Sequence, residues 1–239
     1  MSRDRSKDPP KSAAELMREL QRDPDYVARM QKREREHQEG VEAYSRAVEP
    51  LMQELAASGV QFESLGELRQ SGTDYRSAVP ILLRWLSKID DAAVKEDVVR
   101  TLSVPSAKPT AAPALVEEFK KANYPHGDEL RWAIANGLAV VADDSVFEEL
   151  VELVRDRRNG KAREMLALGL ANMENPSAVA VLMGLLEDEQ TVGHAVMALG
   201  KLKAVAARAR LESLTQHPTE WVREEAKKAL TNLGQSRLN

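Results

Sequence analysis

The chain has 239 residues, no cysteine and a formal net charge of −4, from 34 lysines and arginines against 38 aspartates and glutamates. The lack of cysteine excludes disulfides, cysteine-ligated zinc, iron–sulfur clusters and thiol catalysis. The nearly balanced charge argues against a surface for duplex nucleic acid, which needs clustered lysines and arginines. We find no apolar leader and no apolar run of membrane-spanning length, so we expect a cytoplasmic protein that does not enter a membrane.

Residues 1–40 form a charged segment. The first eleven residues are polar and include Pro9 and Pro10, so we expect disorder there. From Ser12 onward sparse apolar residues recur at helical spacing, with an interruption at Asp23–Pro24. The stretch QKREREHQE alternates in charge and almost lacks an apolar face, which is typical of a solvated helix. The alternative is an arm that folds onto a partner.

Six similar helices follow, each predicted to be the first helix of a pair. We interpret residues 41–75 as a degenerate pair, residues 76–234 as five further pairs and residues 235–239 as a tail. The first three helices contain prolines at positions 50, 80 and 113, spaced by 30 and 33 residues. We place each one in the early part of its helix, where it either starts the regular turn or kinks the helix. Gly40, Gly59 and Gly72 are expected in loops.

The second helix of each pair repeats around a fixed anchor position. Arg100, Arg131, Arg163, Val192 and Arg223 occupy this position, and they are 31, 32, 29 and 31 residues apart. A repeat of roughly 30 to 45 residues with two helices per repeat is typical of an α-solenoid. The chain is therefore predicted to be all-α, a solenoid of antiparallel helix pairs that follows a charged N-terminal helix and tail.

Small and large residues keep fixed distances from the anchor. A small residue stands six positions after it and a leucine seven positions after it in four copies: Gly137, Gly169, Ala198 and Ala229, then Leu138, Leu170, Leu199 and Leu230. With the positions one before and three after the anchor, these residues lie on one helix face. The small residue predicts a close approach of the next helix, so a large side chain at Gly169 or Ala198 should overpack the stack.

These patterns resemble the second helix of the HEAT-repeat family. The best copies are VGHAVMALGKL and WVREEAKKALTNLG, which are similar to the short bacterial repeats also seen in phycobilisome-lyase-like proteins. The resemblance implies a right-handed superhelix with the first helices on its convex side and the second helices on its concave side. It also implies scaffolding and protein binding. Val192 at the fourth anchor and Pro105 after the first copy depart from the pattern, and we expect irregular stacking there.

Four of the anchors form what we call the arginine ladder: Arg100, Arg131, Arg163 and Arg223. In the HEAT family such arginines usually bind acidic residues in the turns. Asp97, Asp128 and Glu220 each stand three residues before a ladder arginine, so the resemblance implies a structural role. The alternative is a track that binds anions such as phosphates. That track would need lysines and aromatic residues beside the arginines, whereas glutamates follow Arg163 and Arg223.

A candidate partner-binding surface follows from the positions that should point away from the stack. The candidates are Trp132, Asn136, Met165, Leu168, Asn172, His194, Met197 and Lys201. Trp132 and Asn136 are four residues apart and share a helix face. This pairing resembles the one that armadillo-type proteins use to clamp an extended peptide, with an apolar slot and an amide for the peptide backbone. The alternative is that Trp132 and the methionines complete the packing between pairs.

We find no pattern that predicts catalysis or a cofactor. The four histidines, at positions 37, 126, 194 and 217, do not have metal-ligand spacing. Searches for a nucleophile elbow, a P-loop and HExxH find none of them. We therefore expect no enzyme, no metal and no cofactor.

The sequence favours a scaffold that binds another protein or a peptide. One alternative is a nucleic-acid-binding solenoid similar to the alkylation-repeat DNA glycosylases, which the acidic charge disfavours. A further alternative is an enzyme similar to bilin lyases, or a chaperone, and its only support is the resemblance of the short repeats. The oligomeric state stays open.

Overall fold

The computed structural model describes residues 12–108, 110–122 and 127–235, and every regular element within these ranges is a helix. The chain divides into two compact units, Met1–Ala47 and Val48–Asn239, which we describe separately. The segment predicted to be disordered, residues 1–11, and most of the predicted tail lie outside the described residues.

The first unit contains α1 (Ala13–Arg22) and the first part of α2 (Pro24–Ala57). Ser12 and Glu15 form a capping box at the start of α1, and Asp23 ends that helix. The Asp23 carboxylate then accepts hydrogen bonds from the backbone N–H groups of Asp25 and Tyr26, in the first turn of α2. The predicted interruption at Asp23–Pro24 is therefore confirmed. Residues 31–39 are helical and exposed, as expected for a solvated helix.

Two predictions about α2 are wrong. Gly40 was expected in a loop and Pro50 in the early part of a helix, but both lie well inside this single 34-residue helix. A helical glycine costs only about 1 kcal/mol relative to alanine, and good helix formers such as Glu39 flank it. Pro50 costs more, but Leu51 and Leu55 directly after it are buried. Their burial offsets the lost hydrogen bond and keeps the last turns helical.

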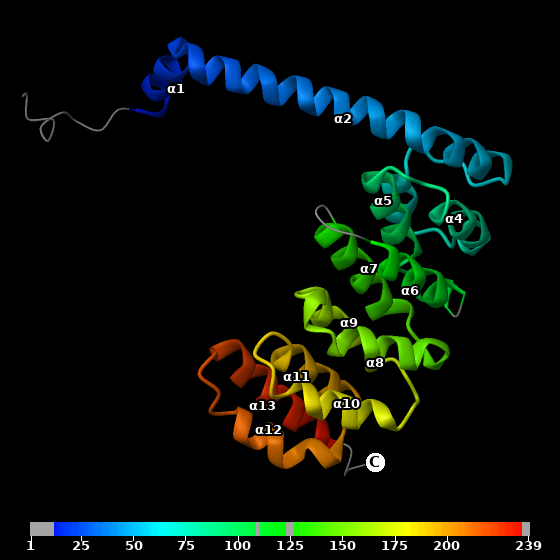
Figure 1. Cartoon of the computed structure of the whole chain (residues 1–239), viewed down its shortest axis with the longest axis vertical. Coiled ribbons are helices and arrows are strands. Elements are labelled where there is room, and N and C mark those ends of the chain that lie inside the picture. The colour runs from blue at the N-terminus through cyan, green and yellow to red at the C-terminus, as the bar shows by residue number, and fades with distance from the viewer. Residues whose placement is uncertain (1–11, 109, 123–126, 236–239) are drawn as a thin grey trace, which may run out of the picture. The chain divides into compact units, whose positions relative to one another are not determined.

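The second unit consists of successive helix pairs (Figure 1). The end of α2 is followed by α3 (Leu65–Gln70). The later pairs are α4 (Val79–Leu86) with α5 (Ala92–Leu102), α6 (Ala111–Lys121) with α7 (Gly127–Val141), α8 (Phe147–Arg155) with α9 (Ala162–Leu170), α10 (Ser177–Leu185) with α11 (Val192–Lys201), and α12 (Arg208–Leu214) with α13 (Glu220–Gln235). Short 3-10 turns at Arg76–Ala78, Pro105–Ala107, Asp144–Val146 and Val205–Ala207 precede α4, α6, α8 and α12, and a fifth, Arg157–Asn159, precedes α9.

Local sequence signals explain several of these boundaries. Pro80 lies in the first turn of α4 and Pro113 is the third residue of α6, so the prediction of an early proline is confirmed for these two. Asp91 caps α5 by accepting a hydrogen bond from the Val94 N–H at 3.0 Å. Gly160 adopts a φ of 48° between the 3-10 turn and α9, a conformation that glycine adopts with little strain.

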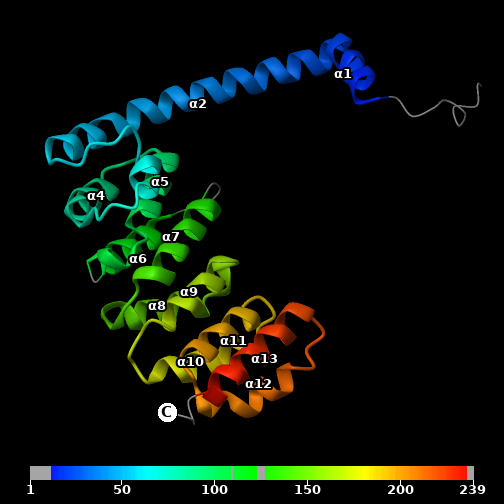
Figure 2. The same ribbon diagram turned by 180° about the vertical axis from the view of Figure 1, so that it is seen from behind.

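Helices contact one another both within a pair and between consecutive pairs. From α4 onward each first helix contacts its own second helix, and α3 contacts α5. The second helices then contact one another in the order α5, α7, α9, α11 and α13 (Figures 1 and 2). The residues predicted to face this stack are buried, except that Leu130 and Leu230 are half-buried. A Cβ atom placed on Gly169 would lie 3.0 Å from Leu150 Cδ2 and 3.3 Å from the Leu138 carbonyl oxygen. The predicted close approach at this position is therefore confirmed.

Candidate binding face of the second helices

Two ladder arginines, Arg131 and Arg163, reach the C-terminal end of the first helix in their own pair, and Arg223 reaches the loop that follows α12. The Nε atom of Arg131 donates to the Ala122 carbonyl at 2.8 Å, and that of Arg163 donates to the Val154 carbonyl at 2.6 Å. In the last pair Arg223 Nη1 donates to the His217 carbonyl at 2.8 Å. The last carbonyls of a helix have no intrahelical partner and carry partial negative charge. Arg131 and Arg163 therefore cap the first helix and join it to the second, whereas Arg223 joins α13 to the loop after α12.

Two of the same arginines also reach the following pair. Arg131 Nη1 donates to Asn159 Oδ1 at 3.3 Å, and Arg163 Nη2 binds Asp188 Oδ2 at 2.9 Å. Asn159 and Asp188 lie in the turns before α9 and α11. Both arginines are thus bound to polar turn residues of the following pair.

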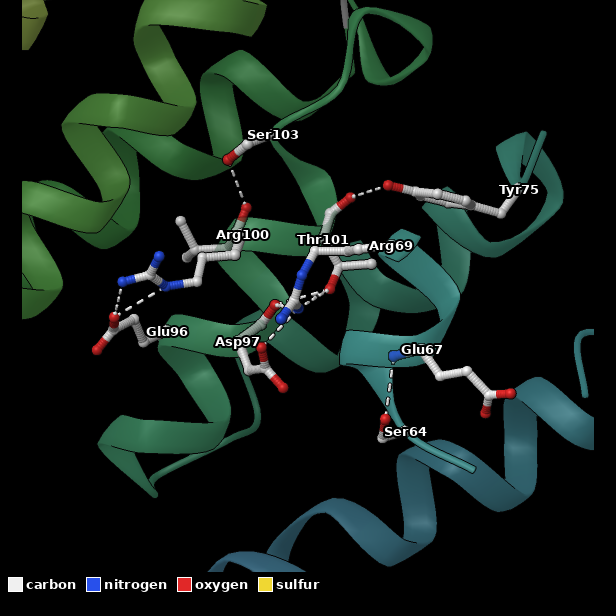
Figure 3. Close-up of polar contacts among 10 residues, drawn as sticks. Ser64, Glu67, Arg69, Tyr75, Glu96, Asp97, Arg100, Thr101 and Ser103 are labelled. Carbon is white, nitrogen blue, oxygen red and sulfur yellow. Dashed lines mark hydrogen bonds and ion pairs between the residues drawn. The ribbon is translucent and has the colours of Figure 1, made fainter. Parts of the chain in front are cut away.

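The first member of the ladder is arranged differently. Arg100 pairs with Glu96 at 2.5 Å, whereas Asp97, its expected partner, binds Arg69 of α3 at 2.5 Å (Figure 3). Arg69 also donates to Thr101 Oγ1 at 2.9 Å. The expectation that Asp97 pairs with Arg100 is therefore corrected, because the neighbouring helix α3 supplies a different arginine. The side chain of Asp128 lies outside the described residues.

The fourth pair compensates for its missing arginine. Val192 has no polar side-chain atom, but the hydroxyl of the preceding residue, Thr191, donates to the Leu185 carbonyl at 3.0 Å. Leu185 is the last residue of α10, and Thr191 is fully buried. The hydroxyl thus performs the capping that Arg163 performs in the preceding pair. Despite the departure in sequence, α11 contacts α9 and α13 as the other second helices contact their neighbours.

The eight predicted binding residues differ in exposure. Trp132 is 42% exposed and Met197 is 37% exposed, and Lys201 is also exposed. The remaining five are half-buried: Asn136, Met165, Leu168, Asn172 and His194. The expectation that Trp132 and Met197 are reachable from outside thus agrees with their placement.

Three of the polar candidates make hydrogen bonds within the chain. Asn136 Nδ2 donates to the carbonyl of Trp132 at 2.7 Å. Asn172 Nδ2 donates to the Ala139 carbonyl at 2.7 Å, and Lys201 Nζ donates to Asn172 Oδ1 at 2.5 Å. Asn172 and Lys201 therefore link α7, the end of α9 and α11. One amide N–H group of Asn136 is therefore already bonded to the Trp132 carbonyl, although the armadillo-type resemblance implied that the amide binds the backbone of a peptide.

A pocket of about 560 Å³ lies at the N-terminal part of α7 and α9. It is lined by Glu96, Arg100, Glu129, Arg131, Trp132, Asn159, Gly160, Lys161, Ala162 and Gln190. Of the eight predicted binding residues, only Trp132 is among them. The pocket instead combines Trp132 with two ladder arginines, Arg100 and Arg131, for which the sequence had favoured a structural role over an anion-binding one.

The residues predicted from the sequence to bind a partner did not include one set of exposed side chains on this helix face. In the last four copies the position two residues before the anchor holds Glu129, Lys161, Gln190 and Trp221, and all four are exposed, whereas the first copy has the buried Val98 there. This position lies on the same helix face as the positions two and five residues after the anchor. The signal was therefore present in the repeat alignment, as polar or aromatic residues at a constant offset.

Trp221 lies against the preceding second helix. A Cβ atom placed on Gly193 would lie 1.9 Å from Trp221 Cζ3, so the indole occupies the space beside this glycine. The Trp221 ring also contacts the ring of His194, with centroids 5.1 Å apart. Trp221 thus extends the exposed aromatic surface to α13 while it joins α13 to α11.

His194 is held in a partly desolvated site below this indole. Its Nδ1 atom is buried and has no hydrogen-bond partner among the described residues. The nearest carboxylate oxygen, Glu164 Oε2, is 3.9 Å away. Burial lowers the pKa of His194 below its ordinary value, and the opposite effect of Glu164 and Glu225 does not cancel this shift.

This lowered pKa predicts a loss of stability on acidification. The unfolded chain takes up a proton on His194 as the pH falls through about 6.5, while the folded chain resists protonation, so the free energy of unfolding decreases. We expect His194→Gln to reduce the decrease in stability between about pH 7.5 and pH 5.5. Urea unfolding of both proteins across this range measures the effect. Equal decreases in the two proteins would show that His194 is not responsible.

Other sites and known proteins add little to this face. In the described ranges, no three histidine, aspartate or glutamate side chains lie close enough to hold a metal ion. None of the described helices combines the length and apolar character needed to cross a membrane. Comparison with protein families and with curated proteins finds no match for this chain.

Proposed function

We propose that this protein is a non-enzymatic scaffold that binds another protein or a peptide on the face of its second helices. The repeated anchor and the contacts between consecutive second helices support a HEAT-like architecture, a right-handed α-solenoid with these helices on its concave side. In such an architecture the exposed residues of successive second helices form one continuous surface. An extended partner then contacts several pairs at once.

The observation that carries this proposal is the position of Trp132. Its indole is 42% exposed and lines the 560 Å³ pocket. Exposed tryptophan is costly to hydrate and is enriched among the residues that contribute most to binding energy. An apolar side chain of the partner would lie against the indole. Lys161, Gln190 and Glu129 on the rim would contact its polar groups.

The experiment is an affinity pull-down with wild type and Trp132→Ala/Met165→Ala, with and without nuclease. We expect the wild type to retain a protein that the double variant binds at least about tenfold more weakly. Because Trp132 is exposed and Met165 half-buried, the helical melt of Trp132→Ala alone should change little. A large loss of stability would instead assign Trp132 to packing.

A matched control is Val205→Ala. Val205 is 57% exposed and lies in the turn between α11 and α12, away from the positions that form the proposed surface. This variant should bind like the wild type.

Recovery of nucleic acid that nuclease and salt release would favour the nucleic-acid-binding alternative.

A further inference from the structure

The turn before α9 is rich in positive charge, although the whole chain has a formal net charge of −4. Residues 155–161 contain a single carboxylate, Asp156, and four cationic residues: Arg155, Arg157, Arg158 and Lys161. All four cationic residues are exposed. Arg158 pairs with Asp156 at 2.7 Å and neutralises it. An excess of positive charge therefore stays at the surface of this turn.

Lys161 brings this charge to the pocket at the N-terminal part of α7 and α9. It lines the 560 Å³ pocket together with Trp132. Within the part of the chain that the structure describes, the Lys161 ammonium makes no ion pair or hydrogen bond. The pocket thus offers a cation that nothing in the chain neutralises and an exposed indole that nothing in the chain covers.

Two carboxylates also line this pocket, and one of them is already neutralised. Glu96 accepts a hydrogen bond from Arg100 Nε at 2.9 Å (Figure 3). Glu129 is exposed and makes no ion pair or hydrogen bond with any described residue. The three cations of the lining, Arg100, Arg131 and Lys161, outnumber these two carboxylates. The pocket therefore attracts an anionic group more strongly than a cationic one.

The positive charge does not continue along the face beyond α9. A neighbouring pocket shares Gly160 and Gln190 with the first one. Its other lining residues are two arginines and three carboxylates: Arg157, Arg163, Glu187, Asp188 and Glu189. A nucleic acid carries a phosphate at every nucleotide and needs a run of cations along its path. A peptide can carry one carboxylate where the cation lies and uncharged residues elsewhere, so the charge pattern favours a peptide.

We propose that the segment of the partner that occupies this pocket is an acidic peptide. An apolar side chain of the peptide lies against Trp132, and the carboxylate of an aspartate or glutamate two residues away binds Lys161. Side chains two residues apart in an extended peptide point to the same side, so both can enter one pocket. This inference rests on the proposed scaffold function and adds the chemistry of the partner.

Selection of random peptides displayed on phage, with the full chain as bait, tests the proposal. We expect the selected peptides to carry aspartate or glutamate two residues from an apolar side chain. Each selected peptide is then synthesised with an acetylated N-terminus and an amidated C-terminus, so that its side chains supply the only carboxylates. Fluorescence anisotropy measures its affinity for the wild type and for each variant, at low and at high salt.

Two substitutions in the pocket should change this affinity in opposite directions. Lys161→Gln should weaken binding about threefold to fivefold, and Glu129→Gln should strengthen it about twofold. Both effects should shrink at high salt, because salt screens exposed charges. The control is Lys203→Gln, which makes the same charge change at an exposed residue between α11 and α12 and should leave the affinity unchanged. Thermal melts check that each variant is folded.

The outcomes distinguish this inference from the scaffold proposal. Selected peptides that depend on Trp132 but lack acidic residues, or that Lys161→Gln does not affect, would overturn the acidic partner and leave the scaffold standing. Peptides rich in lysine and arginine would instead assign the pocket to a cationic partner. A failure to select any peptide, or peptides that Trp132→Ala binds as tightly as the wild type does, would count against both proposals. Binding of a single-stranded oligonucleotide in place of peptides, lost in Lys161→Gln, would assign the cations to nucleic acid.

Discussion

Arg163→Ala is expected to lower the free energy of unfolding by about 3–5 kcal/mol, because it removes one partner of a buried, hydrogen-bonded ion pair. The Arg163 side chain is 4% exposed and binds Asp188, which is 17% exposed, at 2.9 Å. The substitution also leaves the Val154 carbonyl without the guanidinium that caps α8. Burial alone would raise the pKa of Asp188, but hydrogen bonds from Arg163 and the Gln190 N–H lower it overall. The carboxylate thus depends on this arginine.

The matched control is Arg157→Ala. Arg157 pairs with the same oxygen of Asp188 at 3.5 Å, but its side chain is 82% exposed. Exposed pairs contribute little because water and salt screen them, so this variant should change stability by less than about 0.5 kcal/mol. Urea unfolding of both variants provides the comparison. Similar losses for the two arginines would show that the buried network around Arg163 does not stabilise the stack.

Gly200→Ala is expected to destabilise the protein by about 1–3 kcal/mol, although alanine is the better helix former. A Cβ atom on Gly200 would lie 2.8 Å from Ala229 Cβ and 2.9 Å from Ala229 Cα. Part of this obstacle is backbone, so α11 and α13 would have to move apart. Their separation would open the packing between the last two pairs.

Gly184→Ala is the control, since Gly184 lies in α10 and a Cβ atom there would contact nothing within 4 Å. Alanine at this site should stabilise the protein by about 0.5–1 kcal/mol through its higher helix propensity. Thermal unfolding of both variants tests the opposite signs. If Gly200→Ala were also stabilising, the close contact between α11 and α13 would not limit packing.

The sequence predicted most of the helices because the repeat supplies the same signal several times. From α7 onward the second helices begin close to the anchor, and the small residues at Gly137 and Gly169 lie at close contacts, as their spacing indicated. The continuity of α2 was not predicted, since Gly40 and Pro50 are local signals against a helix. The burial of Leu51 and Leu55, which overrides the proline, is a tertiary effect.

The candidate site was predicted less completely. Helical periodicity placed Trp132 and Met197 away from the stack but left packing between pairs as an alternative, and both residues are exposed. The partners of Arg163 did not, because the Val154 carbonyl and Asp188 come from elements on either side of α9 and meet only after the pairs stack. The bridge from Asn172 to Lys201 depends on the same stacking.

Site-specific photo-cross-linking tests the binding face most directly. A benzoylphenylalanine replaces Met197, which is 37% exposed on α11, or in a second protein Val205, which is more exposed but lies outside the face. The partner recovered in the pull-down is purified and irradiated with each protein. We predict cross-links from position 197 and none from position 205. Cross-links from position 205 alone would contradict binding on the face of the second helices.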